Sequence, residues 1–331
     1  MNKSNNLMFI TIMMASVPIA ISSNSWFIVW LSMEINMMSF MPLIMEQKNT
    51  LSKEAALTYF ITQTMASMLL IMSFIMKNNM FITNNMGELL IMSSLMIKSG
   101  ISPFHFWMPK VMEGLNWNKC LLLMTWQKII PLMMMSNIIK INMITLMAMI
   151  LSTSIGAIGG LNQTSLRKLM AYSSITNNGW MMAAMLLSEN IWMMYFLLYS
   201  MMNVILTKSM NMYKNYHINQ ILSMNESTSS KFFLLINMLS ISGLPPMMGF
   251  MPKWLVMQSS TTMNELMLMG SMVIMTLITI YYYLRIMFPV MMLCNMEPKW
   301  NNKTNKNTKT LMLMVTTTFM GLMIITMISL M

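Results

Sequence analysis

The chain has 331 residues, of which 56% are hydrophobic and only 9% are charged. This composition lies well outside the range of soluble globular proteins, so a water-soluble fold is all but excluded. The net charge of +11 would suggest a nucleic-acid partner for a soluble domain, but here the lysines separate apolar runs, which indicates membrane topology.

Eleven apolar runs, each bounded by polar clusters, predict membrane-spanning helices. Most are close to the roughly 20 residues that cross a bilayer. They are continuous, whereas a membrane β-barrel would show alternating segments of about ten residues. We therefore expect an all-α polytopic membrane protein with about eleven transmembrane helices, over residues 7–21, 26–45, 57–76, 82–110, 119–137, 141–161, 166–187, 191–209, 232–257, 266–290 and 311–331.

The distribution of basic residues predicts the orientation of these helices. The first run carries only Lys3 and lacks a small-residue cleavage site, so we expect a membrane helix there and no removable leader. Eleven spans place the termini on opposite sides. Basic loops stay on the matrix or cytoplasmic side, which favours that side for the N-terminus. In the eleven-helix arrangement, fourteen basic residues fall on the side of the N-terminus and only two, Lys77 and Lys140, fall on the other side. The fourteen are Lys3, Lys48, Lys53, Lys110, Lys119, Arg167, Lys168, Lys208, Lys214, Lys231, Lys299, Lys303, Lys306 and Lys309.

Two segments that lie 143 residues apart share one pattern. Residues 99–110 read Ser-Gly-Ile-Ser-Pro through Trp-Met-Pro-Lys, and residues 242–253 read Ser-Gly-Leu-Pro-Pro through Phe-Met-Pro-Lys. Gly and Pro interrupt a helix and free its backbone polar groups. The copies fall on predicted helices that cross in opposite directions, which indicates inverted repeats with two discontinuous helices; a chance kink in each is the alternative. We expect a single membrane domain, 1–331, made of repeats 1–137 and 141–290 and an extra C-terminal helix, 311–331.

Ionisable residues inside the predicted spans are candidates for function, because a charge at the bilayer centre costs about 2.5–3.5 kcal/mol on insertion scales. Glu34 lies too deep for its short side chain to reach water, and Lys98, just before the first break, is its natural partner. Lys128 lies mid-helix with Pro131 one turn further on, and we expect it to be the central proton carrier.

Two further candidates lie at the breaks themselves. Lys253 follows the second break, and its alternative is an interfacial anchor beside Trp254. His105 lies within the first break and could relay protons, since imidazole takes both protonation states near neutral pH. A histidine bonded to a freed carbonyl is an equally good interpretation.

The content of cysteine, histidine and methionine bears on cofactors and origin. Two cysteines, Cys120 and Cys294, and two histidines, His105 and His217, cannot supply an iron–sulfur cluster or a convincing haem pair. We therefore expect no metal and no bound cofactor.

The 57 methionines suggest a coding bias such as that of an organelle that reads an isoleucine codon as methionine, which indicates mitochondrial synthesis.

Several motifs resemble one family along nearly the whole chain: mitochondrial NADH dehydrogenase subunit 2, an antiporter-like membrane subunit of respiratory complex I, in its arthropod form. The motifs are Trp30-Leu-Ser-Met-Glu34-Ile-Asn36, Tyr59-Phe-Ile-Thr-Gln63, Pro103-Phe-His-Phe-Trp-Met-Pro109, Thr125-Trp-Gln-Lys128, the run from Gly160 to Ser174, and the run from Gly243 to Trp254.

The resemblance implies a core subunit of the proton-translocating NADH:ubiquinone oxidoreductase in the inner mitochondrial membrane. NAD, FMN, iron–sulfur clusters and ubiquinone would be used by other subunits, and the partners would be membrane lipids and neighbouring membrane-arm subunits, including antiporter-like ones, with no nucleic acid. It also implies that Glu34 and Lys98 act as a coupled pair, with Lys128 central and Lys253 toward the exit.

Three positions depart from the family pattern. Thr58 and Asn177 stand where similar animal sequences have Lys and His, and Lys110 stands where Glu is usual.

Two other function classes stay open: a stand-alone cation/proton antiporter on the same scaffold, and a non-conducting structural spacer that would tolerate loss of Glu34 and Lys128.

The first prediction concerns cofactors. The purified chain should show no haem, flavin or iron–sulfur absorbance, because its two thiols and two imidazoles cannot assemble a redox site. An absorption spectrum with metal analysis tests this, and a stoichiometric chromophore would contradict it.

Overall fold

The computed structural model describes residues 3–46, 49–78, 84–224, 228–260 and 266–293. These residues form α-helices joined by short loops, with no β-strand among them. The chain divides into two compact units, Met1–Thr145 and Leu146–Met331, which are described separately below. The predicted all-α membrane fold is confirmed, and the predicted span 311–331 lies outside the described residues.

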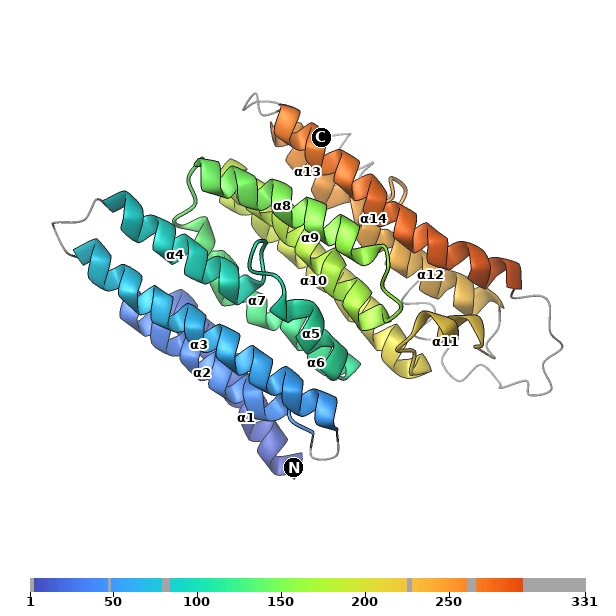
Figure 1. Cartoon of the computed structure of the whole chain (residues 1–331), viewed down its shortest axis with the longest axis horizontal. Coiled ribbons are helices and arrows are strands. Elements are labelled where there is room, and N and C mark those ends of the chain that lie inside the picture. Colours follow the sequence, from blue (N-terminus) through green and yellow to red (C-terminus); the bar gives the residue numbers. More distant parts are fainter. Residues whose placement is uncertain (1–2, 47–48, 79–83, 225–227, 261–265, 294–331) are drawn as a thin grey trace. The chain divides into compact units, whose positions relative to one another are not determined.

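The first unit is built on a pair of apolar helices, α1 (Lys3–Ser22) and α2 (Trp26–Ile44), which pack closely together. Next come α3 (Thr50–Asn78) and α4 (Asn84–Ser99), and α3 packs against both α2 and α4 (Figure 1). Three short helices complete the unit, of which α5 lies on α3 and α7 lies on α4: α5 (Trp107–Gly114), α6 (Trp117–Met124) and α7 (Trp126–Ser136).

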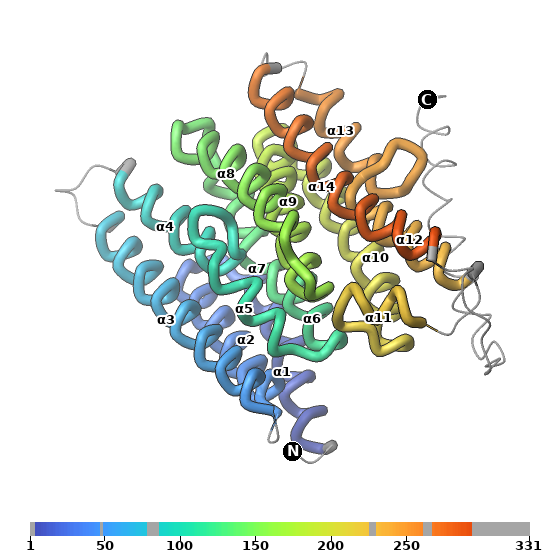
Figure 2. Tube along the Cα trace, turned by 45° about the vertical axis from the view of Figure 1, so that its right-hand side comes forward, coloured from blue at the N-terminus to red at the C-terminus, as the bar shows by residue number. Residues whose placement is uncertain are grey.

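The second unit is arranged around two long helices, α9 (Leu166–Leu187) and α10 (Glu189–Tyr213), which contact each other and are joined through Ser188. The Ser188 side chain caps α10 by accepting a hydrogen bond from the backbone N–H of Ile191. The other helices pack around this pair (Figure 2): α8 (Met143–Gly160), the short α11 (Ile218–Leu222), α12 (Thr228–Ser242), α13 (Phe250–Ser260) and α14 (Leu266–Leu293).

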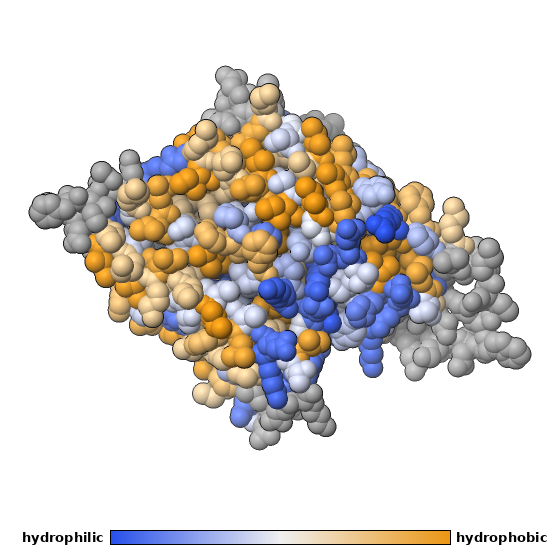
Figure 3. Space-filling model, in the orientation of Figure 1, coloured by the Kyte–Doolittle hydropathy of each residue, from blue (hydrophilic) through white to orange (hydrophobic). Residues whose placement is uncertain are grey.

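Six described helices are long and apolar enough to cross a membrane, namely α1, α2, α3, α8, α10 and α14. Their outer faces expose large apolar side chains such as Phe27, Met65 and Ile274, as lipid-facing helices must, and Figure 3 shows apolar residues over much of one face. The 22-residue α9 is more polar and is buried over most of its length. It is therefore an inner helix that neighbouring helices shield from lipid.

The two predicted helix breaks are present and have corresponding boundaries. Helix α4 ends at Ser99 and α5 begins at Trp107, while α12 ends at Ser242 and α13 begins at Phe250. Each offset is the 143 residues that separate the sequence copies. The first residue of each break is a glycine in the left-handed region, Gly100 with φ 73° and Gly243 with φ 88°.

The first break closes α4 with a Schellman motif. The N–H of Ile101 donates to the carbonyl of Met96 at 3.0 Å, and the N–H of Gly100 donates to that of Ile97 at 3.3 Å. These two bonds satisfy carbonyls that a helix end leaves without partners. The indole N–H of Trp107, from the far side of the break, also donates to the Ile97 carbonyl at 3.0 Å.

A third interruption, which the sequence analysis did not predict, divides the expected helix 119–137 at Thr125. The residue has φ −114° and ψ −72°, and its hydroxyl donates to the Leu121 carbonyl at 2.7 Å. Pro131 has no N–H for the carbonyl of Gln127, and a proline ring crowds the carbonyl four residues before it. Pro131 itself lies inside α7, which starts anew at Trp126.

The glycine at the first break gives the second prediction. Gly100→Ala should lower the free energy of unfolding by about 1–2 kcal/mol, because a Cβ is disfavoured at this positive φ. Gly270→Ala is the control: Gly270 is an exposed residue within α14 with open space around it, so alanine should be neutral or stabilise by up to about 1 kcal/mol. Thermal unfolding of the purified protein in detergent compares the two, and equal effects would contradict the assignment.

Candidate functional site

Glu34 and Lys98 form an ion pair inside the first unit. Their carboxylate Oε1 and ammonium Nζ atoms lie 3.6 Å apart, with the Lys98 side chain 4% exposed and the Glu34 side chain 20% exposed. Glu34 comes from the middle of α2 and Lys98 from the last turn of α4. The C-terminal end of a helix also favours a cation through the helix dipole. The structure thus brings together the two residues whose pairing the sequence suggested.

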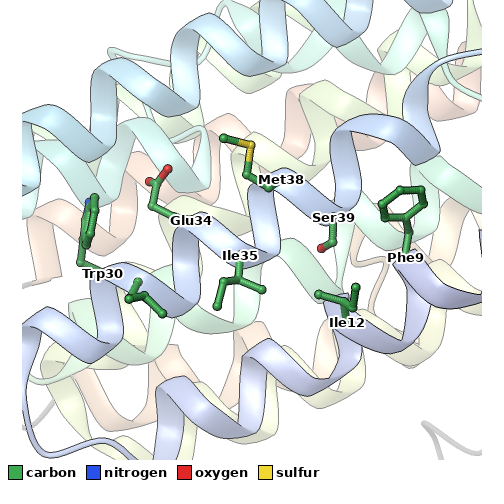
Figure 4. A pocket seen from close by; sticks show the side chains of 8 residues that line it. Phe9, Ile12, Trp30, Glu34, Ile35, Met38 and Ser39 are labelled. Carbon is green, nitrogen blue, oxygen red and sulfur yellow. The ribbon is translucent and has the colours of Figure 1, made fainter.

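Glu34 also lines an apolar pocket of about 370 Å³ between α1 and α2. Phe9 and Ile12 contribute the α1 side of this pocket, and Trp30, Ile35 and Met38 are among the α2 residues. Figure 4 shows Glu34 and Met38 pointing to the same side of α2. Glu34 therefore borders an open pocket, while Lys98 is enclosed.

A chain of hydrogen bonds between neutral side chains joins three helices of the same unit. The Tyr59 hydroxyl of α3 donates to Gln127 Oε1 at 3.2 Å, and Gln127 Nε2 donates to Asn36 Oδ1 of α2 at 3.0 Å. Sequence reasoning did not select these residues, although Asn36 lies two positions from Glu34 and Gln127 adjoins Lys128. The signal that could have found them is a polar side chain next to a buried charge in an otherwise apolar segment.

Lys128 is buried within α7, with 2% of its surface exposed. Its backbone N–H donates to the Thr125 carbonyl at 3.2 Å, so the residue lies in the first turn after the interruption. Helix α7 packs against α4, the helix that carries Lys98. The first unit thus holds two buried lysines on neighbouring helices, at or next to points where the helical backbone is broken.

His105 lies within the first break and is 3% exposed. Its Nδ1 is 3.2 Å from the carbonyl oxygen of Pro103, so Nδ1 carries the hydrogen that this bond requires. Its ring lies against that of Phe106, with 4.2 Å between the centroids. This geometry is that of a histidine bonded to a freed carbonyl, and its role in proton relay stays a prediction.

Lys253 occupies the corresponding break in the second unit, and it is buried, with 4% of its surface exposed. Its Nζ donates to the Ser242 carbonyl at 2.7 Å, across the break, and lies 6.0 Å from the centre of the Trp180 ring. A Cβ on Gly243 would come within 2.8 Å of this Nζ, so the glycine leaves room for the ammonium. An exposed interfacial anchor, the alternative considered for Lys253, does not fit this burial.

The matching lysine of the first copy behaves differently. Lys110 is exposed, although it stands 143 residues before Lys253 and the helix boundaries around both correspond. The two copies thus share the backbone break but not the buried cation.

A second neutral polar contact lies on the inner helix of the second unit. The Tyr195 hydroxyl of α10 donates to Asn177 Oδ1 at 3.0 Å, and Asn177 Nδ2 donates to the Ser173 carbonyl at 2.9 Å. Asn177 is one of the departures from the family pattern, and it is 3% exposed. The position keeps a buried hydrogen-bonding group that does not titrate.

The third prediction tests the buried and exposed lysines of the two copies. Lys253→Met should destabilise the protein by about 1–3 kcal/mol, because it leaves the Ser242 carbonyl without its donor. Lys110→Met makes the same change at the exposed matching position and should stay within about 0.5 kcal/mol. Thermal unfolding of both variants in detergent is the measurement. If both variants lost the same free energy of unfolding, the hydrogen bond from Lys253 to the Ser242 carbonyl would contribute nothing to stability.

Comparison with known proteins identifies the family. Residues 23–279 match the family described as NADH:quinone oxidoreductase/Mrp antiporter, transmembrane. The NADH-ubiquinone oxidoreductase chain 2 of Aedes aegypti is 46% identical over 99% of this chain and 99% of its own, and that of Anopheles gambiae is 43% identical over 93% and 92%. A chain in the structure of respiratory complex I from Thermus thermophilus with bound aureothin has the same fold, with a TM-score of 0.80 and 18% identity over 96% of this chain and 76% of that one. The chain therefore belongs to the NADH:quinone oxidoreductase/Mrp antiporter family and, within it, to the NADH-ubiquinone oxidoreductase chain 2 group.

Proposed function

We propose that this chain is a core membrane subunit of respiratory complex I that moves protons across the inner mitochondrial membrane, driven by electron transfer from NADH to ubiquinone in other subunits. Its partners are the other membrane-arm subunits. Relatives at 43–46% identity carry the name NADH-ubiquinone oxidoreductase chain 2, which supports this assignment. The methionine excess and the fourteen-to-two asymmetry of basic residues support the inner mitochondrial membrane, with the N-terminus in the matrix and the C-terminus in the intermembrane space.

The observation that carries the proposal is the set of lysines buried beside broken helices. As whole residues, Lys98, Lys128 and Lys253 are 7%, 2% and 4% exposed, and each lies at or next to an interruption of its helix. An ammonium at membrane depth is costly and is retained where it has a task. Lysine can also lose its charge when it is desolvated, which a proton carrier requires.

In the proposed relay, the Glu34–Lys98 pair opens and lets Lys98 exchange a proton toward Lys128. The neighbouring helices α4 and α7 carry these two lysines, and the Tyr59–Gln127–Asn36 chain holds the backbone region next to Lys128 to α2 and α3. Lys253 is the carrier of the second unit, and His105 is an additional relay at the first break. The chain binds no NAD, flavin, iron–sulfur cluster or quinone itself.

A stand-alone cation/proton antiporter is the second candidate, because the matching family includes Mrp antiporters. The two functions differ in what drives transport. A complex I subunit moves protons only when NADH is oxidised, whereas an antiporter exchanges a cation for protons down an imposed gradient. Proteoliposomes that contain this chain alone, given a sodium gradient and an internal pH dye, should show no exchange.

The fourth prediction concerns Lys128. Lys128→Met keeps the apolar stem and similar volume but removes the titrating group, so the complex should assemble while proton pumping per NADH falls at least severalfold. Lys208→Met is the control, since Lys208 is an exposed lysine of α10. Pumping is measured with a pH dye in proteoliposomes that contain the assembled complex. Unchanged stoichiometry and rate in the Lys128 variant would make Lys128 a packing residue.

The fifth prediction concerns the ion pair. Glu34→Gln should destabilise the chain by about 1–3 kcal/mol, because it leaves the enclosed Lys98 ammonium without its carboxylate. Adding Lys98→Met should recover part of that loss, since the uncompensated charge is then gone. Unfolding of the two single variants and the double variant gives the coupling energy. If the two substitutions changed the free energy of unfolding in a strictly additive way, the result would contradict a functional pair.

A further inference from the structure

Among the described residues, one end of the second unit is rich in basic residues and poor in acidic ones. In the described part of this unit Glu189 is the sole acidic residue, and it begins α10. Basic residues lie at the start of α9 and at the other end of α10: Arg167, Lys168, Lys208 and Lys214. At about 1.5 Å of rise per residue, Glu189 lies about 28 Å from Lys208 and about 37 Å from Lys214 along the axis of α10.

Backbone contacts hold this basic end together. The N–H of Leu166 donates to the Tyr216 carbonyl at 2.9 Å, and the N–H of Ile218 donates to the Thr164 carbonyl at 3.2 Å. These bonds tie the segment before α9 to the segment after α10. The basic residues of both helices therefore belong to one surface, and no described acidic side chain of this unit lies there to balance them.

A pocket of about 410 Å³ opens at this same end. The loop residues Asn162, Gln163 and Thr164 form one wall, and Tyr282, Arg285 and Pro289 of α14 form another. The guanidinium of Arg285 donates to the Leu161 carbonyl at 3.3 Å, which orients it but does not neutralise its charge. Among the described residues that line it, the pocket thus combines a cation with hydroxyl and amide groups and has no carboxylate.

The outer face of α14 continues from this pocket as an exposed apolar stripe. Leu277, Tyr281, Phe288 and Met292 follow the same side of the helix as Arg285, and they are 59%, 59%, 59% and 73% exposed. The arrangement suits an amphiphile, with an anionic head at Arg285 and hydrocarbon along α14. A free anion would use the pocket but not the stripe.

We propose that this pocket binds the phosphate headgroup of an anionic phospholipid, with its acyl chains against the outer face of α14. Charge complementarity selects the anionic class, because basic pockets between membrane helices attract such headgroups. The guanidinium binds the phosphate oxygens, and the Asn162–Thr164 loop offers further donors. This site is independent of the proton relay proposed above, and it does not share residues with it.

The test uses the assembled complex in nanodiscs of phosphatidylcholine that contain a trace of photoactivatable phosphatidylglycerol with a diazirine in its acyl chain. Peptide mapping by mass spectrometry should place labels on α14. Arg285→Gln should reduce that labelling about fivefold, which is the loss of affinity expected when one basic residue is removed from an anionic lipid surface. Lys110→Gln removes the same charge from an exposed residue of the first unit that does not line the pocket, and it should leave labelling unchanged.

Two further arms decide the source of the anion. Photoactivatable phosphatidylcholine should label α14 less than phosphatidylglycerol does, and 10 mM inorganic phosphate should not displace the lipid label. Equal labelling by both lipids, or no effect of Arg285→Gln, would overturn the proposal. Displacement by phosphate would show a free-anion site instead, and absence of any label on α14 in the unchanged complex would show that protein, such as residues 311–331, covers this face.

Discussion

The cost of holding an ammonium group inside a membrane governs the arrangement of this protein. Water is absent there, so every buried cation needs a carboxylate, a carbonyl or another polar group of the protein. The chain meets this need by breaking helices. Lys98 ends a helix and faces Glu34, Lys253 donates to a carbonyl at the other side of its break, and Lys128 follows the interruption at Thr125. The breaks and the lysines therefore have to be understood together.

The two internal copies show that backbone and side-chain chemistry can diverge separately. Both copies keep the left-handed glycine and the same helix boundaries. Only the second buries its lysine, while the first closes α4 with a Schellman motif and the Trp107 indole and leaves Lys110 exposed. In the first unit the buried cation next to this break comes instead from Lys98, on the preceding side of the break. The shared element is thus a backbone opening, which each copy fills in its own way.

The fold could be predicted from the sequence wherever a span is continuous and apolar, because length and hydropathy suffice there. The Gly-Pro breaks were also visible, since these residues cannot continue a helix. The break at Thr125 could not be read in the same way, because threonine is compatible with a helix and Pro131 lies inside α7, past the break. For the site, buried charge drew attention to Glu34 and the three lysines, but the neutral Tyr59–Gln127–Asn36 chain depends on packing among three helices, which a linear sequence does not reveal.

The polarity of α9 has a consequence for the biogenesis of the protein. This helix carries Asn177 and Asn178 near its middle and Arg167 and Lys168 near its start, and nearly all of its surface is covered by protein. A segment with these residues gains little from entering lipid alone. Its neighbours in the chain, α8 and α10, are long and apolar enough to cross a membrane. We therefore expect helix α9 to enter the membrane together with them, after α10 has been synthesised.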